Sequence, residues 1–202
     1  MRRQILAISG GGFSKEIPSE IDSYLILQIQ KEKIKICFIP TASNDAQGYI
    51  DNFYKAFPNC EASHILQNNL QEAATMEHVL SQDILYVGGG NTKSMLAKWR
   101  EAGFHDVLLE AYEKGVLLAG ISAGAMCWFE KCFSENEQDE YEAFDGLGIL
   151  KGTFCPHYDD KNRRAAFASW IAQRPDLQAY TLTDEEYLHF ENEGLKAHLI
   201  TK

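Results

Sequence analysis

The chain has 202 residues, of which 45% are hydrophobic and 24% are charged, and its formal net charge at pH 7 is −10. This composition is typical of a folded globular protein, and the length suffices for a full hydrophobic core. We therefore expect residues 1–202 to form a single domain. The acidic balance argues against a nucleic-acid partner, because phosphate binding needs a basic surface. No apolar run approaches the roughly 20 residues of a membrane-spanning helix, so no membrane partner is expected.

The first residues are basic and then apolar, as in a signal peptide, but the apolar segment is short and runs into glycines at Gly10. The five cysteines are an odd number without metal-site spacing, and neither C-x-x-C nor H-E-x-x-H occurs. Reduced thiols fit a cytoplasmic protein. We therefore expect a cytoplasmic protein with no metal and no cofactor.

Short apolar runs alternate with amphipathic stretches, which predicts an α/β chain with a mainly parallel central sheet flanked by helices. In chain order, the predicted strands span residues 4–9, 34–39, 62–66, 83–87, 116–119 and 145–154, with further strands over 179–200. The predicted helices begin at Pro18 and near Tyr49, and then span residues 75–80, 92–99, 105–113, 125–133 and 161–173. Residues 134–142 are strongly acidic and are expected to form a surface loop or flap.

The segment around Ser122 carries the most specific chemistry. Gly120-x-Ser122-x-Gly124 is the nucleophile-elbow pattern, and it lies between a predicted strand and a predicted helix. Small residues must flank such a serine, because the sharp turn brings it close to neighbouring strands. The free N–H groups at the start of the helix favour a developing negative charge. Ser122 is therefore the expected nucleophile, with the backbone N–H of Ala123 as an oxyanion donor. The alternative is a tight turn with a capping serine.

A serine nucleophile needs a base, and the chain has six histidines. His157 follows a predicted strand and stands beside Pro156, in the kind of loop that presents catalytic side chains. His189 and His198 alternate in the terminal strands and are expected to face solvent. The other three precede the elbow, in a weak strand or on helices, where packing or surface roles are expected. His157 is the favoured base.

Spacing alone does not identify the carboxylate that would orient this histidine. Asp184, Glu185 and Glu186 are consecutive near the end of the next predicted strand, whereas Asp159 and Asp160 are closer to His157 in sequence. Each is also a plausible solvated surface acid.

A second glycine cluster, Gly88-Gly89-Gly90, follows the predicted strand 83–87. A nucleotide site is excluded, because the dinucleotide glycine spacing and a G-K-[ST] motif are both missing. Glycines at the end of a strand instead allow backbone N–H groups to approach a substrate carbonyl, which suggests a second oxyanion donor here.

Together these residues resemble the family of dipeptidase E (aspartyl dipeptidase) and cyanophycinase, serine peptidases with a fold like class I glutamine amidotransferases. The resemblance covers most of the chain, and its motifs occur in the same order. Their occurrence together is specific, although no single motif is. The motifs that carry it are Ile39-Pro40-Thr41-Ala42, Val87-Gly88-Gly89-Gly90-Asn91-Thr92, Gly120-Ile121-Ser122-Ala123-Gly124-Ala125, Gly146-Leu147-Gly148 and Pro156-His157-Tyr158. The resemblance implies a three-layer, flavodoxin-like domain.

The resemblance also implies a Ser-His-Glu triad in which Ser122 attacks the carbonyl and His157 transfers the proton. Its oxyanion donors would be the backbone N–H groups of Gly90 and Ala123. The strand-then-Asp-Glu pattern of the family selects Glu185 as the orienting acid. Comparison without gaps from Pro175 selects Asp184 instead, and Glu186 stands where the family usually has a small residue.

For the substrate, the resemblance implies a dipeptide or short peptide, with an amino-terminal aspartate as the preference of dipeptidase E. By position from Pro175, Arg163 is the residue that would bind this aspartate, with Asn91 also at the substrate site. The acidic segment 134–142 instead suits a free amino terminus or a basic residue, if it covers the site.

Two other functions remain open from the sequence: a non-peptide amidase or esterase, and a catalytically idle amidotransferase-like binding domain. Glutamine amidotransfer is not expected, because it uses cysteine at the elbow. The sequence does not distinguish a monomer from a homodimer. It also leaves open the cleavage-site preference and whether residues 134–142 close as a lid.

Overall fold

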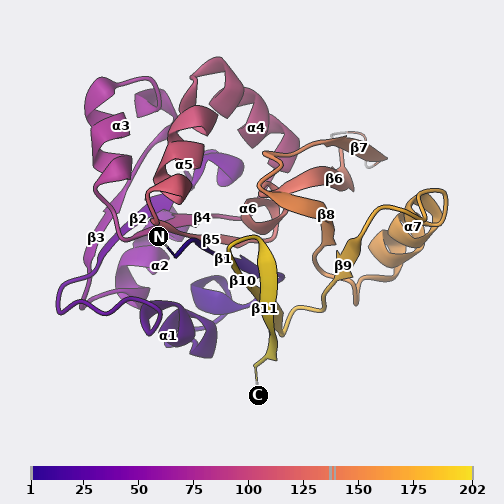
Figure 1. The fold of residues 1–202 in the computed structure, drawn as a ribbon, viewed down its shortest axis with the longest axis horizontal. Coiled ribbons are helices and arrows are strands. Elements are labelled where there is room, and N and C mark those ends of the chain that lie inside the picture. Colours follow the sequence, from indigo (N-terminus) through magenta and orange to yellow (C-terminus); the bar gives the residue numbers. More distant parts are fainter. Residues whose placement is uncertain (1, 137, 139, 202) are drawn as a thin grey trace.

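The computed structural model describes residues 2–136, 138 and 140–201. Figure 1 shows a large sheet with helices on both faces and a smaller sheet at its side that carries the last helix. The strands are β1 (Gln4–Ile8), β2 (Lys35–Ile39), β3 (Glu61–His64), β4 (Ile84–Val87), β5 (Leu117–Ile121), β6 (Phe129–Glu135), β7 (Tyr141–Asp145), β8 (Leu150–Cys155), β9 (Ala179–Thr181), β10 (Glu186–Glu191) and β11 (Gly194–Ile200). The α-helices are α1 (Glu20–Ile26), α2 (Gln47–Ala56), α3 (Ala73–Leu80), α4 (Thr92–Glu101), α5 (Phe104–Glu113), α6 (Ala123–Met126) and α7 (Lys161–Ile171).

Within the described residues, the large sheet has the strand order β11-β10-β1-β5-β4-β2-β3. Strands β1 to β5 are mutually parallel where they pair, whereas β10 runs antiparallel to β1 and β11 antiparallel to β10. The smaller sheet has the order β7-β6-β8-β9, with β7 antiparallel to β6. Since β1 to β5 are parallel, their carboxyl ends meet at one edge of the large sheet, which is where ligands bind in open α/β sheets.

The two faces of the large sheet are covered by different helices. In β1, Ile5 and Ala7 join a buried cluster that includes Trp99 of α4, whereas Leu6 and Ile8 join a cluster that includes Leu25 of α1. Successive strand side chains point to opposite faces, so both faces of a buried strand must be apolar. The prediction of a mainly parallel sheet between helical layers is confirmed.

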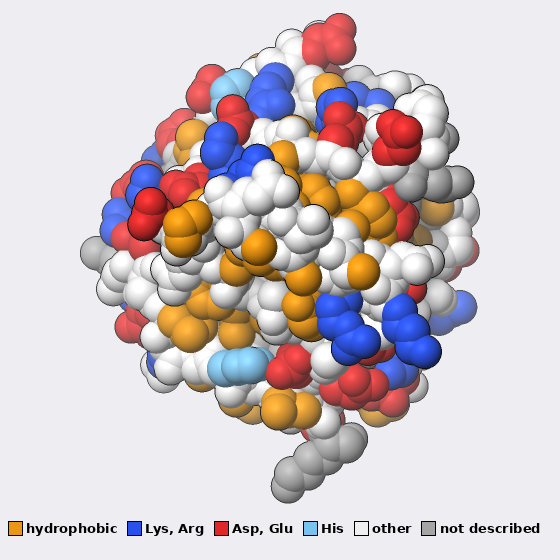
Figure 2. All heavy atoms as spheres, turned by 90° about the vertical axis from the view of Figure 1, so that its right-hand side faces the viewer, with side chains coloured by type: hydrophobic (Ala, Val, Ile, Leu, Met, Phe, Trp, Pro, Cys, Tyr) orange, Lys and Arg blue, Asp and Glu red, His pale blue; other side chains and the backbone are white. Residues whose placement is uncertain are grey.

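Helix α7 packs on the smaller sheet through a separate cluster. Phe167, which is fully buried, contacts Phe133 of β6, and Cys155 of β8 belongs to the same cluster. Figure 2 shows this face of the molecule, on which apolar side chains gather across the middle with charged groups around them. None of the described helices is long and apolar enough to cross a membrane.

The predicted helix over residues 125–133 is wrong. Helix α6 ends at Met126 after four residues, and β6 begins at Phe129. Residues 125–129 are all buried, so this stretch has no polar face to indicate its period. A short, uniformly buried apolar run is compatible with either a helix or a strand.

The expectation that His189 faces solvent is also wrong. Its side chain is buried in β10 between the Tyr24 hydroxyl, 2.8 Å from Nδ1, and the Gln4 side-chain oxygen, 3.0 Å from Nε2. Burial lowers the pKa of His189 to about 4. His198, by contrast, is exposed and pairs with Glu186.

Asp22 of α1 is a buried carboxyl group without a hydrogen-bond partner for either oxygen. Its residue is 5% exposed, and the Phe13 backbone N–H and the hydroxyls of Ser19 and Tyr86 lie nearby and partly offset the effect of burial on its pKa. Burial raises the pKa of Asp22 from 3.8 to about 7. The folded protein therefore holds this proton up to near-neutral pH, because the charged form is poorly solvated there.

Asp22→Asn is expected to stabilise the protein at pH 8 by about 4 kcal/mol and to change stability little at pH 4. The folded state binds more protons than the unfolded state between the two pKa values of 3.8 and about 7. Stability of the wild type is therefore lost as pH rises through this window, and the neutral amide removes that loss. Urea unfolding at both pH values measures the difference, with exposed Asp176→Asn as the matched control. An Asp22→Asn gain that is equal at both pH values contradicts the assignment.

Candidate active site

Ser122 lies in the turn between β5 and α6, with φ 52° and ψ −109°. This conformation is strained for a residue with a side chain, as expected of a nucleophile elbow. Only glycine fits at the flanking positions: a Cβ on Gly120 would lie 2.0 Å from the Gly124 carbonyl oxygen, and one on Gly124 would lie 2.3 Å from the Val87 carbonyl oxygen. The Ser122 N–H donates to the Ile8 carbonyl at 2.9 Å, which ties the elbow to β1.

His157 lies in the loop after β8 and faces the serine. Its Nε2 is 2.9 Å from Ser122 Oγ. Its backbone has φ 54°, in the left-handed region, so the loop turns sharply at this residue. The two residues that the sequence analysis expected as nucleophile and base are therefore within hydrogen-bonding distance.

The carboxylate that contacts His157 is Asp184, not the expected Glu185. Asp184 Oδ1 is 2.5 Å from His157 Nδ1. Glu185 points away and pairs with Lys15 at 3.4 Å. Glu186 accepts from the N–H and hydroxyl of Thr183 at 2.6 and 2.8 Å. The three acids lie on a tight turn, where successive side chains leave in different directions, so only one of them reaches the histidine.

All three side chains are accessible from solvent. Ser122 is partly exposed, and the side chains of His157 and Asp184 are 33% and 37% exposed. The residues come from the ends of β5, β8 and the segment before β10, and a substrate can reach the serine without movement of the core. Within the described residues, no group of three or more His, Cys, Asp or Glu side chains is arranged to hold a metal ion.

Of the two expected oxyanion donors, Ala123 directly follows Ser122 at the start of α6. The other, Gly90, follows Gly89, on which a Cβ would lie 3.5 Å from Ser122 Cβ. Of the hydrogen bonds in the described part of the chain, none uses the backbone N–H of Gly90 or of Ala123. Both groups therefore retain their capacity to donate to a bound oxygen atom.

A cavity of about 470 Å³ extends from Asn91 along α4 to the β6–β7 hairpin. Asn91 itself caps α4, because its side chain accepts from the Ser94 N–H at 2.9 Å. The acidic segment expected as a loop forms much of this hairpin, with Glu135 and Glu142 on the cavity wall, while Glu137 and Asp139 lie outside the described residues. Lys93 pairs with Glu142 at 2.7 Å across the cavity. The hairpin thus borders the glycine loop beside Ser122.

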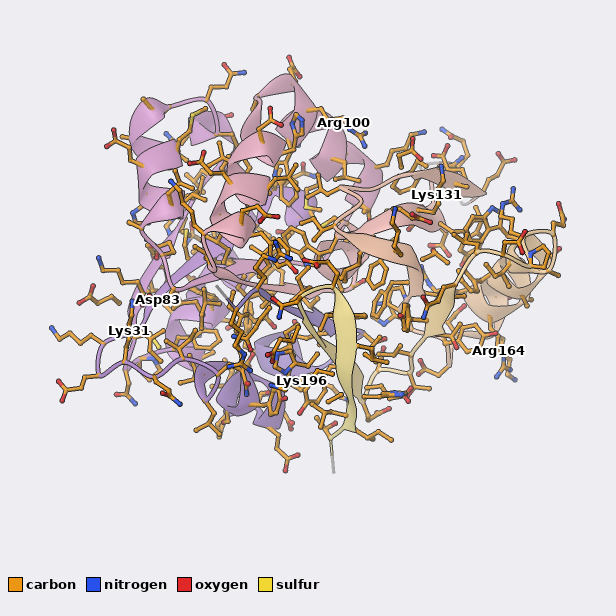
Figure 3. The ribbon with its side chains drawn as sticks, in the orientation of Figure 1. Lys31, Asp83, Arg100, Lys131, Arg164 and Lys196 are labelled. Atoms are coloured by element: carbon orange, nitrogen blue, oxygen red, sulfur yellow. The ribbon has the colours of Figure 1, made fainter. Side chains whose placement is uncertain are left out.

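Arg163 lies on the first turn of α7, three residues after its cap Asp160. Its guanidinium carbon is 5.8 Å from the centre of the Tyr141 ring in β7, a cation–π contact. Among the described residues, no acidic side chain forms an ion pair with Arg163. Arg164 is exposed on the outer side of α7 (Figure 3).

Cys127 is excluded as a nucleophile. It is fully buried, its Sγ is 3.1 Å from the Gly124 carbonyl oxygen, and burial raises its pKa well above the usual value. A reactive cysteine needs an accessible thiolate.

A parallel sheet that brings serine, histidine and aspartate into one hydrogen-bonded series at its carboxyl edge defines a serine hydrolase, a class recognised by this geometry on unrelated folds. Residues 5–198 match the family model described as peptidase family S51. The chain belongs to this family and is a serine peptidase.

Similar proteins are also named as peptidases. The chain is 42% identical over 197 residues to the Bacillus subtilis (strain 168) protein named uncharacterized peptidase YgaJ, covering 96% of this chain and 85% of that protein. It is 25% identical over 130 residues to peptidase E of Salmonella arizonae, covering 59% of this chain and 57% of that protein. A crystal structure of a putative peptidase E protein from Listeria monocytogenes EGD-e aligns over 100% of both chains, with a TM-score of 0.77 and 17% identity, which shows a shared fold.

Proposed function

We propose that this protein hydrolyses dipeptides or short peptides through a Ser122–His157–Asp184 triad and an acyl-enzyme. The observation that carries the proposal is the continuous series of contacts from Ser122 Oγ to His157 Nε2 at 2.9 Å and from His157 Nδ1 to Asp184 Oδ1 at 2.5 Å. Asp184 takes the place of the glutamate that the family resemblance implies. Either carboxylate fixes the tautomer in which Nε2 is free to accept a proton.

The proposed reaction has two halves. His157 Nε2 accepts the hydroxyl proton of Ser122 as Oγ bonds to the scissile carbonyl carbon, and the imidazolium then gives this proton to the leaving amine as the C–N bond breaks. Water attacks the resulting ester with His157 again as base, which releases the acid and restores Ser122. The N–H groups of Gly90 and Ala123 would donate to the carbonyl oxygen as it becomes negative.

An amino-terminal aspartate is the substrate residue that fits the charges around the site. Arg163 offers a guanidinium without an acidic partner among the described residues, which suits a side-chain carboxylate. Glu135 and Glu142 in the neighbouring hairpin are the acids that suit the free ammonium group of the same residue, which would compete with Lys93 for Glu142. Tyr141, which contacts Arg163 of α7, precedes Glu142 in β7, so helix α7 approaches the strand that carries this acid.

In this proposal, activity requires no partner other than a small peptide substrate. The proposal places the enzyme in the cytoplasm, where dipeptides arise from protein turnover, with either a monomer or a homodimer as the active species.

The direct test combines a dipeptide panel, with Asp-Xaa and Lys-Xaa members, with labelling by a fluorophosphonate probe. We expect Asp-Xaa hydrolysis and one labelled serine, located at Ser122 by peptide mapping. Labelling of Ser122 without peptide hydrolysis would favour a non-peptide amide or ester substrate. Absence of both would favour an idle binding domain and would overturn the proposal.

Arg163→Ala is expected to raise KM for Asp-Xaa peptides by about tenfold or more and to change hydrolysis of Ala-Xaa peptides by less than twofold, because only the former would lose a charge-assisted hydrogen bond of about 1.5–3 kcal/mol. Steady-state kinetics on both peptide series measures the effect. Arg164→Ala is the matched control, since Arg164 is exposed on the same helix. Equal losses on both series, or equal effects of both variants, would remove Arg163 from the substrate site.

A further inference from the structure

The carboxyl end of β1 contacts every segment that carries a residue of the proposed triad. The Ile8 carbonyl accepts the Ser122 N–H at 2.9 Å. The next residue, Ser9, is completely buried, and its Oγ accepts the His157 N–H at 2.8 Å and donates to the Leu182 carbonyl at 3.0 Å. In the sequence, Ser9 stands only as the last residue of the predicted strand 4–9. The sequence feature that could have identified Ser9 is its position, because it is a polar residue at the carboxyl end of a central parallel strand.

Gly10, the residue after Ser9, leaves the space that the Asp184 carboxylate occupies. A Cβ built on Gly10 would lie 2.6 Å from Asp184 Oδ1 and 2.7 Å from its carboxyl carbon, so a side chain at position 10 would displace this carboxylate. The Ser9 N–H donates to the Glu186 carbonyl at 3.2 Å, which fixes the other side of the same turn. Ser9 and Gly10 together set the distance between the acid turn and the histidine loop.

The Ser9 hydroxyl has a defined orientation because its two partners demand opposite roles. Its single proton goes to the Leu182 carbonyl and its lone pair receives the His157 N–H. The Leu182 carbonyl also accepts the Tyr158 N–H at 2.9 Å, so it stays paired if the hydroxyl is removed. The His157 N–H would be left without this acceptor, at a residue whose φ of 54° already needs support from its surroundings.

We propose that Ser9 is a positioning residue that holds His157 in line between Ser122 and Asp184, an inference that rests on the proposed triad. Ser9 touches neither substrate nor reacting atoms. It acts on the backbone of the base, and through Leu182 on the segment that leads to the acid. Loss of the Ser9 hydroxyl is expected to misplace the His157 imidazole and to leave the substrate site unchanged. The chemical step should therefore slow, whereas substrate binding should not weaken.

The test compares Ser9→Ala with Thr153→Val. Thr153 is also completely buried, in the strand that leads to His157, but its hydroxyl has no hydrogen-bond partner. For Ser9→Ala we expect kcat on the best peptide to fall by about 10- to 100-fold with KM within about twofold, and the rate of fluorophosphonate labelling to fall in parallel. We expect Thr153→Val to match the wild type in all three.

A spectroscopic measurement separates positioning from general destabilisation. The proton shared by His157 and Asp184 should give a far-downfield ¹H NMR signal in the wild type and in Thr153→Val, well below the unfolding temperature. Asp184→Asn assigns this signal by removing it. In Ser9→Ala the signal should be lost or broadened by exchange with water. If Ser9→Ala does not fold, Ser9→Cys, which keeps a weak donor and acceptor of similar size, takes its place in the same measurements.

The outcomes separate this inference from the proposed function. Full activity and an unchanged downfield signal in the Ser9 variant would overturn the positioning role and leave the peptidase proposal intact. A wild type that neither hydrolyses peptides nor is labelled would overturn the proposed function. The NMR signal would then still decide whether Ser9 aligns His157 with Asp184, with an unchanged signal in the variant counting against it.

Discussion

Ser122→Ala should lower kcat on the best peptide by about 10⁴- to 10⁶-fold, because removal of a serine nucleophile eliminates the acyl-enzyme route and leaves only the contributions of binding and the oxyanion donors. The fold should survive. The variant keeps the Cβ and the N–H that bonds to the Ile8 carbonyl at 2.9 Å, and it removes only an oxygen atom that faces His157. KM is expected to change by less than about threefold, since Ser122 Oγ adds little to binding of the ground state.

This result is measured by steady-state hydrolysis of the best dipeptide, together with fluorophosphonate labelling and thermal unfolding of the same preparation. Ser81→Ala is the control, because Ser81 is an exposed serine at the end of α3 whose hydroxyl bonds to groups of the same helix end, the His78 carbonyl at 2.7 Å and the Gln82 side chain at 3.4 Å. Residual turnover of Ser122→Ala above about 1% of the wild type would show that another group performs the chemistry.

The second large effect distinguishes two neighbouring acids. Asp184→Asn should lower kcat by about 10³- to 10⁴-fold, because an amide next to Nδ1 no longer fixes the productive tautomer or stabilises the imidazolium. Glu185→Gln should remain within about twofold of the wild type, since Glu185 contacts Lys15 on the surface at 3.4 Å and not the histidine. Both changes are nearly isosteric, so neither alters packing.

The comparison is made by kcat and KM for each variant on one peptide, with the far-downfield NMR signal as a check on the histidine contact. A large loss in Glu185→Gln with a small loss in Asp184→Asn would reverse the assignment and restore the acid that the family resemblance implies. Similar losses in both would point to disruption of the whole turn between β9 and β10.

Much of the site is predictable because it depends on residue types that only one local geometry allows. The crowded turn at Ser122 requires Gly120 and Gly124, so the elbow is visible in the sequence. His157 stands out because it follows a strand and a proline. The continuous apolar runs of β1 and β4 likewise identify a sheet covered on both faces, and hence the edge at which these residues meet.

The features that the sequence does not reveal depend on three-dimensional direction. The three consecutive acids, Asp184, Glu185 and Glu186, carry the same charge. Only their order along the turn decides which of them faces His157 Nδ1. Helix α6 ends early because the residues after Met126 enter β6 of the second sheet, where they pair with β7 and β8. The role inferred for Ser9 depends on a contact 148 residues away, which no local pattern encodes.

The position of β1 in the large sheet has a consequence for how the enzyme is made. β1 lies between β5 and β10, and its end bonds to partners at His157 and Leu182, 148 and 173 residues further along the chain. During synthesis, the edge of β1 that pairs with β10 therefore stays uncovered until β10 has been made. The acid turn joins the serine and the histidine only when β10 docks, so a ribosome-bound chain that lacks this strand contains the nucleophile without a working triad. The proposed triad is therefore complete only after residues 186–191 have been made and have docked beside β1.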